Sequence, residues 1–148
     1  MLRGVSRALK PGGRVLLQMG GHGNAAEILA LMDAMPDDPK WQRYFPERVA
    51  GYGFYGPEEY VPWLREAGLT PVRVELLERD MAQVGNEGLA SWIRTTWLPY
   101  TQRVPEADRD DFVSDIVDRY VESHPTDSDG LVHVRMSRLE VEATKPGD

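Results

Sequence analysis

The sequence predicts an α/β fold, and three observations carry the prediction. A short continuous apolar run at residues 15–17 ends at Gly20 and Gly21, which is typical of a strand inside a sheet. Residues 72–76 alternate apolar and charged side chains, which is the period of a second strand. The segments between and after these strands repeat apolar residues at helical spacing. Strands and helices therefore follow one another along the chain.

A helix and a strand are expected at the N-terminus. Leu2, Val5 and Leu9 fall at helical spacing, and the Pro-Gly-Gly turn at residues 11–13 ends that helix. The strand then covers residues 14–19. Its continuous apolar centre predicts burial on both faces, as in a parallel sheet.

A second helix is expected to run from Asn24 to about Met35. Asparagine is a good N-cap residue, and Glu27 follows three residues later, as in a variant of the capping box. The stretch 36–56 is rich in proline, glycine and aromatic residues, and it predicts a long ordered loop or lid.

A third helix and the second strand come next. The helix begins at Pro57, whose fixed φ suits the first turn, and it stops at Gly68. Pro62 removes a helical hydrogen bond unless it lies in the first turn. The alternation over 72–76 then belongs to a strand that covers residues 70–78.

Two more helices and a long strand complete the prediction. The first helix is expected to be capped by Asn86 and to end near Pro99, and the second follows Pro105. The final strand covers residues 131–144. Its apolar positions shift from even to odd numbers along its length, so we expect a β-bulge near residues 137–138.

Composition excludes several classes of function. The chain of 148 residues has a net charge of -7 and no cluster of basic residues, which argues against nucleic-acid binding. No apolar run reaches the roughly 20 residues that cross a bilayer, so we expect no membrane insertion and a cytoplasmic location. Cysteine is absent and the histidines (His22, His124 and His133) are scattered, so we expect no metal site.

Five stretches of the sequence resemble class I S-adenosylmethionine-dependent methyltransferases. Residues 9–17, in which Leu-x-Pro-Gly-Gly precedes an apolar run, look like the turn and fifth strand of that fold. Residues 58–64 and 67–69 resemble the next helix and its exit into the sixth strand. Residues 91–100 and 138–146 resemble the trans-aconitate methyltransferase-like branch. The resemblance covers essentially the whole chain.

This resemblance implies a particular sheet and a particular division of the chain. It implies the C-terminal part of a Rossmann-like methyltransferase sheet, in which the strands lie in the order five, seven, six and the last in sequence is antiparallel. The closing strand would then lie between residues 14–19 and 70–78. The chain would form a single partial domain with helical lid segments. Its core elements would be about 1–35, 57–80 and 131–146, and its lid elements about 36–56 and 86–124.

The resemblance also implies a function for the chain. The family holds S-adenosylmethionine on a glycine-rich loop after its first strand and on an acidic residue after its second, and no stretch here matches either. We therefore expect a truncated protein, the acceptor-binding and lid half of a small-molecule methyltransferase. The complete enzyme would use S-adenosylmethionine, and this chain alone would bind none and lack activity. We assign no catalytic base, because an acceptor that is already a carboxylate needs none.

A small carboxylic acid is the acceptor that this branch of the family implies. Aromatic rings in a lid exclude water and favour a sulfonium through cation–π attraction, and the arginine fork suits a carboxylate. The alternatives are that an aromatic stripe at helical spacing is core and that Arg94 and Arg103 are ordinary surface residues. The residues expected to bind the acceptor are His22, Trp41, Tyr55, Trp92, Arg94, Trp97 and Tyr100.

A nucleotide-binding module is an alternative function. Residues 21–26 spell G-x-G-x-x-A between a strand and a helix, so Gly21 and Gly23 are candidate cofactor-binding residues. The full fingerprint also needs a second parallel strand and an acidic residue about 20 positions later, and Pro36 to Pro39 interrupts that pattern. The simpler interpretation is a tight turn that needs glycine for its dihedral angles.

A non-catalytic interaction domain derived from a methyltransferase is the third hypothesis. The strand at 14–19 is expected to expose an unpaired edge, and the helix face of Leu2, Val5 and Leu9 is expected to be poorly covered. Exposed strand edges pair readily, so we expect a homodimer or another assembly that covers this edge.

Overall fold

The computed structural model describes residues 1–147, and the chain divides into two compact units. The sheet unit consists of Met1–Asn24, Gly53–Arg79 and the chain from Met136 onward. The helical unit consists of Ala25–Tyr52 and Asp80–Arg135. Most of the expected lid falls in the helical unit. Residues 25–35 and 131–135, which we expected in the core, belong to the helical unit as well.

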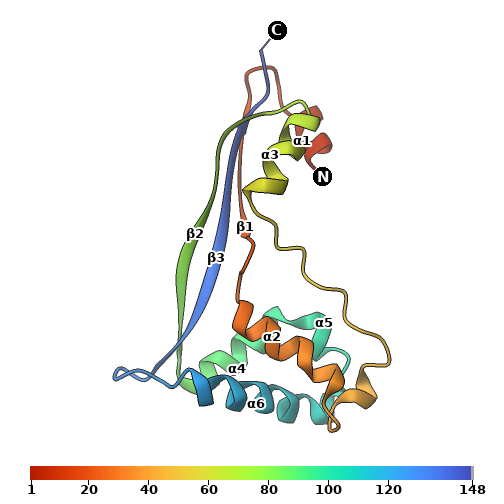
Figure 1. Cartoon of the computed structure of the whole chain (residues 1–148), viewed down its shortest axis with the longest axis vertical. Coiled ribbons are helices and arrows are strands. Elements are labelled where there is room, and N and C mark those ends of the chain that lie inside the picture. The colour runs from red at the N-terminus through yellow and green to blue at the C-terminus, as the bar shows by residue number, and fades with distance from the viewer. Residues whose placement is uncertain (148) are drawn as a thin grey trace. The chain divides into compact units, whose positions relative to one another are not determined.

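The sheet has three strands, β1 (Arg14–Gly20), β2 (Thr70–Val84) and β3 (Leu131–Thr144), in the order β1-β3-β2 (Figure 1). β3 pairs antiparallel with β1, in a register that runs from Arg14↔Thr144 to Gly20↔Arg138. The predicted order is therefore confirmed, with the closing strand antiparallel to the first and placed between the other two. β2 is longer than expected and continues to Val84.

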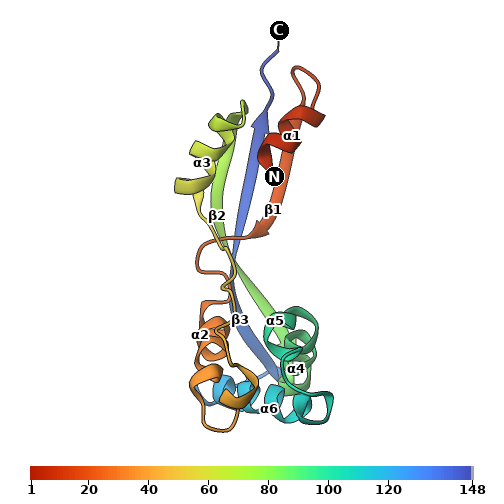
Figure 2. The same cartoon turned by 90° about the vertical axis from the view of Figure 1, so that its right-hand side faces the viewer.

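Helices α1 (Leu2–Ala8) and α3 (Pro57–Glu66) cover one face of this sheet. Figure 1 shows both on the same side of the strands, and Figure 2 looks onto the face that they cover. Lys145 reaches from the end of β3 and donates hydrogen bonds to the carbonyl oxygens of Ser6 and Leu9, at 2.9 and 2.8 Å. A cation at the C-terminal end of a helix is favoured by the helix dipole. The buried residues of this core are Leu2, Tyr60, Leu64, Leu69, Leu139, Val141 and Ala143.

Two predictions about the N-terminal elements were wrong. Leu2 is only 8% exposed, because it packs against α3 and β3 in this core, whereas Val5 and Leu9 are half-buried. β1 is not buried on both faces: burial alternates along it, and Leu16 is 59% exposed. The reason is that α1 and α3 cover only one face of the sheet, so Val15, Leu17 and Met19 pack against them while the alternate residues face the other side.

The opposite face of the sheet is charged. Arg73 of β2 forms ion pairs with Glu140 of β3, at 2.7 Å, and with its neighbour Glu75. Arg138 contributes a second pair to Glu140, at 2.6 Å, and Arg14 of β1 pairs with Glu142. This network holds the three strands together across the face that no helix of the sheet unit covers.

The helical unit is built from four α-helices and two short 3₁₀ turns. The helices are α2 (Ala26–Ala34), α4 (Gly85–Thr96), α5 (Leu98–Thr101) and α6 (Glu106–Ser123), and the turns are η1 (Met35–Asp37) and η2 (Gln42–Tyr44). α6 contacts α2, α4 and α5, so its apolar face forms the centre of this core. Trp41 and Phe45, from the loop expected as a lid, both pack on Phe112 of α6.

The predicted helix caps were wrong at two asparagines. α2 begins at Ala26 after Ala25, whose φ of 48° is left-handed, and the Asn24 side chain instead accepts a hydrogen bond from the Ser137 amide at 3.0 Å. Asn86 lies inside the first turn of α4, which begins at Gly85. The start of α3 is as expected, with Glu59 accepting a hydrogen bond from the Gly56 amide at 2.8 Å.

The apolar positions of β3 shift phase as predicted. Buried residues are Val132 and Val134 in the helical unit, and Leu139, Val141 and Ala143 in the sheet unit. The ladder to β1 is regular as far as Arg138, and the expected bulge stays a prediction. Among the described residues, no helix is long and apolar enough to cross a bilayer.

Candidate functional site

In the turn that follows β1, three of the four backbone amides of residues 21–24 are already bonded. The amide of Gly21 donates to the Ser137 carbonyl at 2.8 Å, that of His22 to the Tyr55 carbonyl at 2.9 Å, and that of Asn24 to the Gly21 carbonyl at 3.0 Å. A glycine turn holds a phosphate or carboxylate through free N–H groups that point at the ligand. With three of its four amides bonded within the chain, this turn offers few of the free N–H groups that such an anion site uses.

The two glycines of this turn have structural reasons of their own. A Cβ on Gly21 would lie 2.3 Å from the Leu76 side chain and 2.9 Å from Leu139, so only glycine lets the turn pack on β2 and β3. Gly23 has a φ of +78°, a left-handed conformation that glycine adopts without strain. Gly21 and Gly23 are thus explained by packing and by backbone geometry.

The same turn brings together two of the residues predicted to bind an acceptor. The His22–Tyr55 backbone hydrogen bond joins the turn to the segment that leads into α3, and both side chains are exposed. The Tyr55 ring meets Trp63 of α3 edge to face, at 4.9 Å between ring centroids. His22 and Tyr55 are therefore free to contact a small molecule.

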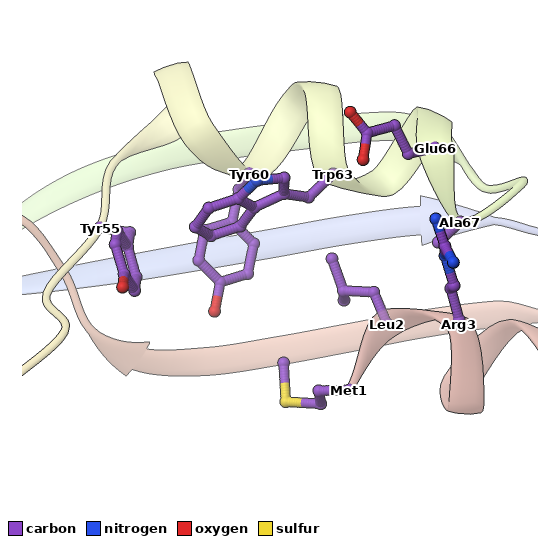
Figure 3. A pocket seen from close by; sticks show the side chains of 8 residues that line it. All are labelled: Met1, Leu2, Arg3, Tyr55, Tyr60, Trp63, Glu66 and Ala67. Atoms are coloured by element: carbon purple, nitrogen blue, oxygen red, sulfur yellow. The ribbon is translucent and has the colours of Figure 1, made fainter.

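Sequence reasoning missed a cavity beside Tyr55. Figure 3 shows the rings of Tyr55, Tyr60 and Trp63 close together on one side, and Arg3 on the other. The cavity has a volume of about 400 Å³, within the range of small-molecule sites. Burial raises the pKa of Tyr60, whose hydroxyl donates to the Met19 sulfur at 2.9 Å. The i, i+3 spacing of Tyr60 and Trp63 was the signal that could have found it.

Trp41 and Tyr100 are core residues of the helical unit. Trp41 is 2% exposed, and its indole N–H donates to Asp115 of α6 at 2.8 Å. Tyr100 is fully buried, and its hydroxyl donates to Asp33 of α2. Burial, followed by the bond to Asp33, raises the pKa of Tyr100. Neither side chain is exposed to a ligand in this structure, so both act in folding.

Trp97 differs from these two residues in one respect. It is also 2% exposed, but its indole N–H has no hydrogen-bond acceptor within the part of the chain that the structure describes. Tyr52 and Trp92 meet its ring edge to face, at 5.0 and 5.7 Å between centroids. A buried donor without an acceptor is uncommon in proteins and costs stability. Trp92 itself is partly exposed at the edge of this cluster.

The two arginines near this helix already have partners. Arg94 forms ion pairs with Glu87 and Asp110, each at 3.1 Å, and Arg103 donates to the carbonyl oxygen of Glu47 at 2.7 Å. The charge of Arg94 is thus balanced by two carboxylates. A carboxylate ligand would bind it only in competition with them. Among residues 1–147, no group of three or more potential ligands is placed to hold a metal ion.

The chain is similar to curated methyltransferases over nearly its whole length. It is 29% identical over 140 residues to a trans-aconitate 2-methyltransferase of Rhizobium leguminosarum bv. trifolii, covering 93% of this chain and 54% of the relative. It is 27% identical, with the same coverage, to a trans-aconitate 2-methyltransferase of Rhizobium etli. The chain therefore spans about half the length of the curated relatives it matches. No family model matches it.

A solved structure shares the fold. A candidate methyltransferase from Bacillus halodurans superposes with a TM-score of 0.50 and 16% identity, over 98% of this chain and 56% of that one. At this identity the match shows the arrangement of strands and helices alone. Together with the sequence similarity to the trans-aconitate 2-methyltransferases, it supports a methyltransferase-like fragment, and the observed strand order β1-β3-β2 agrees with the order that the resemblance implies.

Proposed function

We propose that these residues form the acceptor-binding and lid half of an S-adenosylmethionine-dependent methyltransferase that acts on a small carboxylic acid. The observation that carries the proposal is the similarity to trans-aconitate 2-methyltransferases over 93% of the chain. Trans-aconitate, the acceptor in the relatives' names, is the first compound to test.

The cofactor half of the reaction is proposed to depend on residues other than these. S-adenosylmethionine supplies a methyl group on a sulfonium, and transfer asks mainly that donor and acceptor be held in line and away from water. Three of the four amides of residues 21–24 donate to carbonyl oxygens of the chain, which supports a cofactor site elsewhere. On this proposal the 148 residues by themselves do not catalyse methyl transfer.

The acceptor contacts are proposed for each unit separately. In the sheet unit, His22 and Tyr55 are exposed next to one another, and a neutral or protonated imidazole can donate to a carboxylate oxygen. In the helical unit, Trp92 is partly exposed, and the Trp97 ring that it contacts has an indole N–H with no acceptor among residues 1–147. Trp41 and Tyr100 support this lid from within its core.

The first experiment is a calorimetric titration of the purified chain with S-adenosylhomocysteine. We expect no heat of binding, because three of the four amides of residues 21–24 already donate to carbonyl oxygens of the chain. Binding at micromolar concentration would contradict the proposal that the cofactor binds to residues other than these. Repeating the titration with the Gly23→Val variant would then show whether the turn is the cofactor site after all.

The second experiment tests the acceptor site directly. Trans-aconitate is titrated into isotopically labelled chain while amide chemical shifts are recorded. We expect the amide signals of His22 and Tyr55, or those around Trp92, to shift. The affinity for trans-aconitate should be at least several-fold weaker in His22→Ala or Trp92→Ala. His124→Ala is the matched control, since His124 stacks on Tyr120 of α6 and belongs to neither proposed contact set. Equal binding by all variants, or no shifts with the wild type, would overturn the acceptor assignment.

A further inference from the structure

Trp97 carries a buried hydrogen-bond donor that the helical unit does not use. Its side chain is 2% exposed, and its indole N–H has no acceptor among residues 1–147. Trp41 is equally buried, but its indole N–H donates to Asp115 at 2.8 Å. A buried donor without an acceptor costs stability, so folding alone does not explain an indole at this position. An indole N–H can only donate, so a partner from outside the chain must offer an acceptor such as a carboxylate oxygen.

A positive charge lies shortly after Trp97 in the chain. α5 begins directly after Trp97, and Arg103 follows the end of α5. Within residues 1–147 Arg103 forms no ion pair with a carboxylate, and it donates to the backbone carbonyl of Glu47 at 2.7 Å. Burial and the bond to Asp33 raise the pKa of Tyr100, and the charge of Arg103 opposes that rise. The guanidinium therefore acts within the core of the helical unit, where it favours an anion.

One segment of the chain covers both of these donors. Residues 45–56 form neither helix nor strand. Tyr52 of this segment meets the Trp97 ring at 5.0 Å between centroids, and its hydroxyl donates to a backbone carbonyl of α4 at 3.4 Å. Glu47 of the same segment accepts the bond from Arg103. Tyr52 is only partly buried and lies between two glycines in the sequence, so it can move aside without unwinding a helix. A displacement of this segment would release Arg103 and uncover one side of the Trp97 ring.

We propose that a carboxylate ligand displaces this segment, accepts a hydrogen bond from the Trp97 indole N–H and forms an ion pair with Arg103. The inference rests on the proposed acceptor function, and it assigns a carboxylate of the acceptor to these two donors. It also distinguishes Arg103 from Arg94, whose charge is already balanced by Glu87 and Asp110.

The test follows the indole N–H signals of the isotopically labelled chain while trans-aconitate is added. The chain has four tryptophans, so each signal is assigned by the phenylalanine variant that lacks it. We expect the Trp97 indole proton to move downfield, as an N–H does when it gains a charged acceptor, while the Trp41 signal stays in place. Trp97→Phe keeps an aromatic ring and removes the donor, so its affinity for trans-aconitate should be about tenfold weaker. Trp41→Phe is the matched control: it should keep the wild-type affinity and lose more thermal stability, because it breaks the bond to Asp115.

The arginine is tested in the same titration. Arg103→Gln should also bind about tenfold more weakly, since it removes a charge-assisted hydrogen bond. Arg43→Gln is its control, because Arg43 is an exposed arginine of the same unit that pairs with Asp108 at 3.6 Å, and this variant should bind as the wild type does.

Two outcomes would overturn the inference, and they differ in what they say of the proposed function. If trans-aconitate shifts the amides of His22 or Trp92, but the Trp97 indole signal stays and Trp97→Phe and Arg103→Gln bind normally, this inference alone is wrong. If no signal of the wild-type chain moves, the acceptor function is overturned as well. Should Trp97→Phe fail to fold, as judged by circular dichroism, the indole signal of the wild-type chain and the affinity of Arg103→Gln decide.

Discussion

The two units of the chain hold the predicted site residues in opposite ways. In the sheet unit, His22 and Tyr55 lie on exposed loops, joined by a backbone hydrogen bond, and their side chains remain available. In the helical unit, Trp41 and Tyr100 are buried and donate to carboxylates on neighbouring helices. The presence of an aromatic residue in a segment expected as a lid therefore does not by itself indicate that the residue binds a ligand. A more informative observation is whether the polar atom of that side chain already has a hydrogen-bond partner within the chain.

The largest effect that would sharpen this contrast is expected from Trp41→Ala. The substitution removes a buried ring that packs on Phe112 and a hydrogen bond to Asp115. We expect it to lower the free energy of unfolding by about 3–5 kcal/mol. His22→Ala, its counterpart on the exposed turn, should change that free energy by less than about 0.5 kcal/mol. Urea denaturation monitored by circular dichroism measures both, and equal losses would mean that the units do not differ in this way.

The next largest effect is expected at the glycine turn of the sheet unit. Gly21→Ala forces a Cβ to within 2.9 Å of Leu139, so we expect a loss of about 1–3 kcal/mol from overpacking. Gly23→Ala meets no atom within 4 Å but keeps a left-handed φ, and should cost about 1 kcal/mol. Gly23→Asn should cost less, since asparagine tolerates that conformation better. If Gly23→Ala proved the more damaging change, packing on β2 and β3 would not explain Gly21.

Local patterns predicted the elements and the family resemblance predicted the sheet order, but neither showed how each side chain is used. The run at 15–17 and the alternation at 72–76 gave two strands, while the central place of β3 came from the family resemblance. The predicted cap at Asn86 failed because α4 begins one residue earlier, and the cap at Asn24 failed because its side chain has a competing partner. Asn24 is bonded to Ser137, 113 positions away, and no local pattern records that. Likewise, no local pattern indicates that Arg94 of α4 pairs with Asp110 of α6.

A smaller effect is expected in the sheet unit, where one carboxylate makes stability depend on acid. The ion pair with Arg73, supported by Arg138, lowers the pKa of Glu140 on the charged face of the sheet. The stabilisation is present above the unfolded pKa of a glutamate, about 4.3, and is lost as pH falls through the lower folded value. The melting temperature of Glu140→Gln should therefore lie below that of the wild type at pH 7, and the difference should shrink toward pH 3. A difference that is independent of pH would mean that the carboxylate's charge contributes nothing.

The smallest effect is expected in the helical unit, where the stabilisation is lost as pH rises instead of as pH falls. His133 of β3 lies between Asp127 and Asp80, at 2.8 Å from each, and its bond to Asp127, followed by that to Asp80, raises its pKa. A raised histidine pKa gives stability that is fully present below the unfolded value of about 6.5 and is lost as pH rises through the folded value. His133→Gln should thus melt below the wild type at pH 5.5 and match it near pH 9. Because the three side chains are largely exposed, the difference should also shrink in about 1 M salt, where charges are screened within about 3 Å. Persistence of the difference at high pH would assign the role of His133 to its neutral hydrogen bonds instead of to its charge.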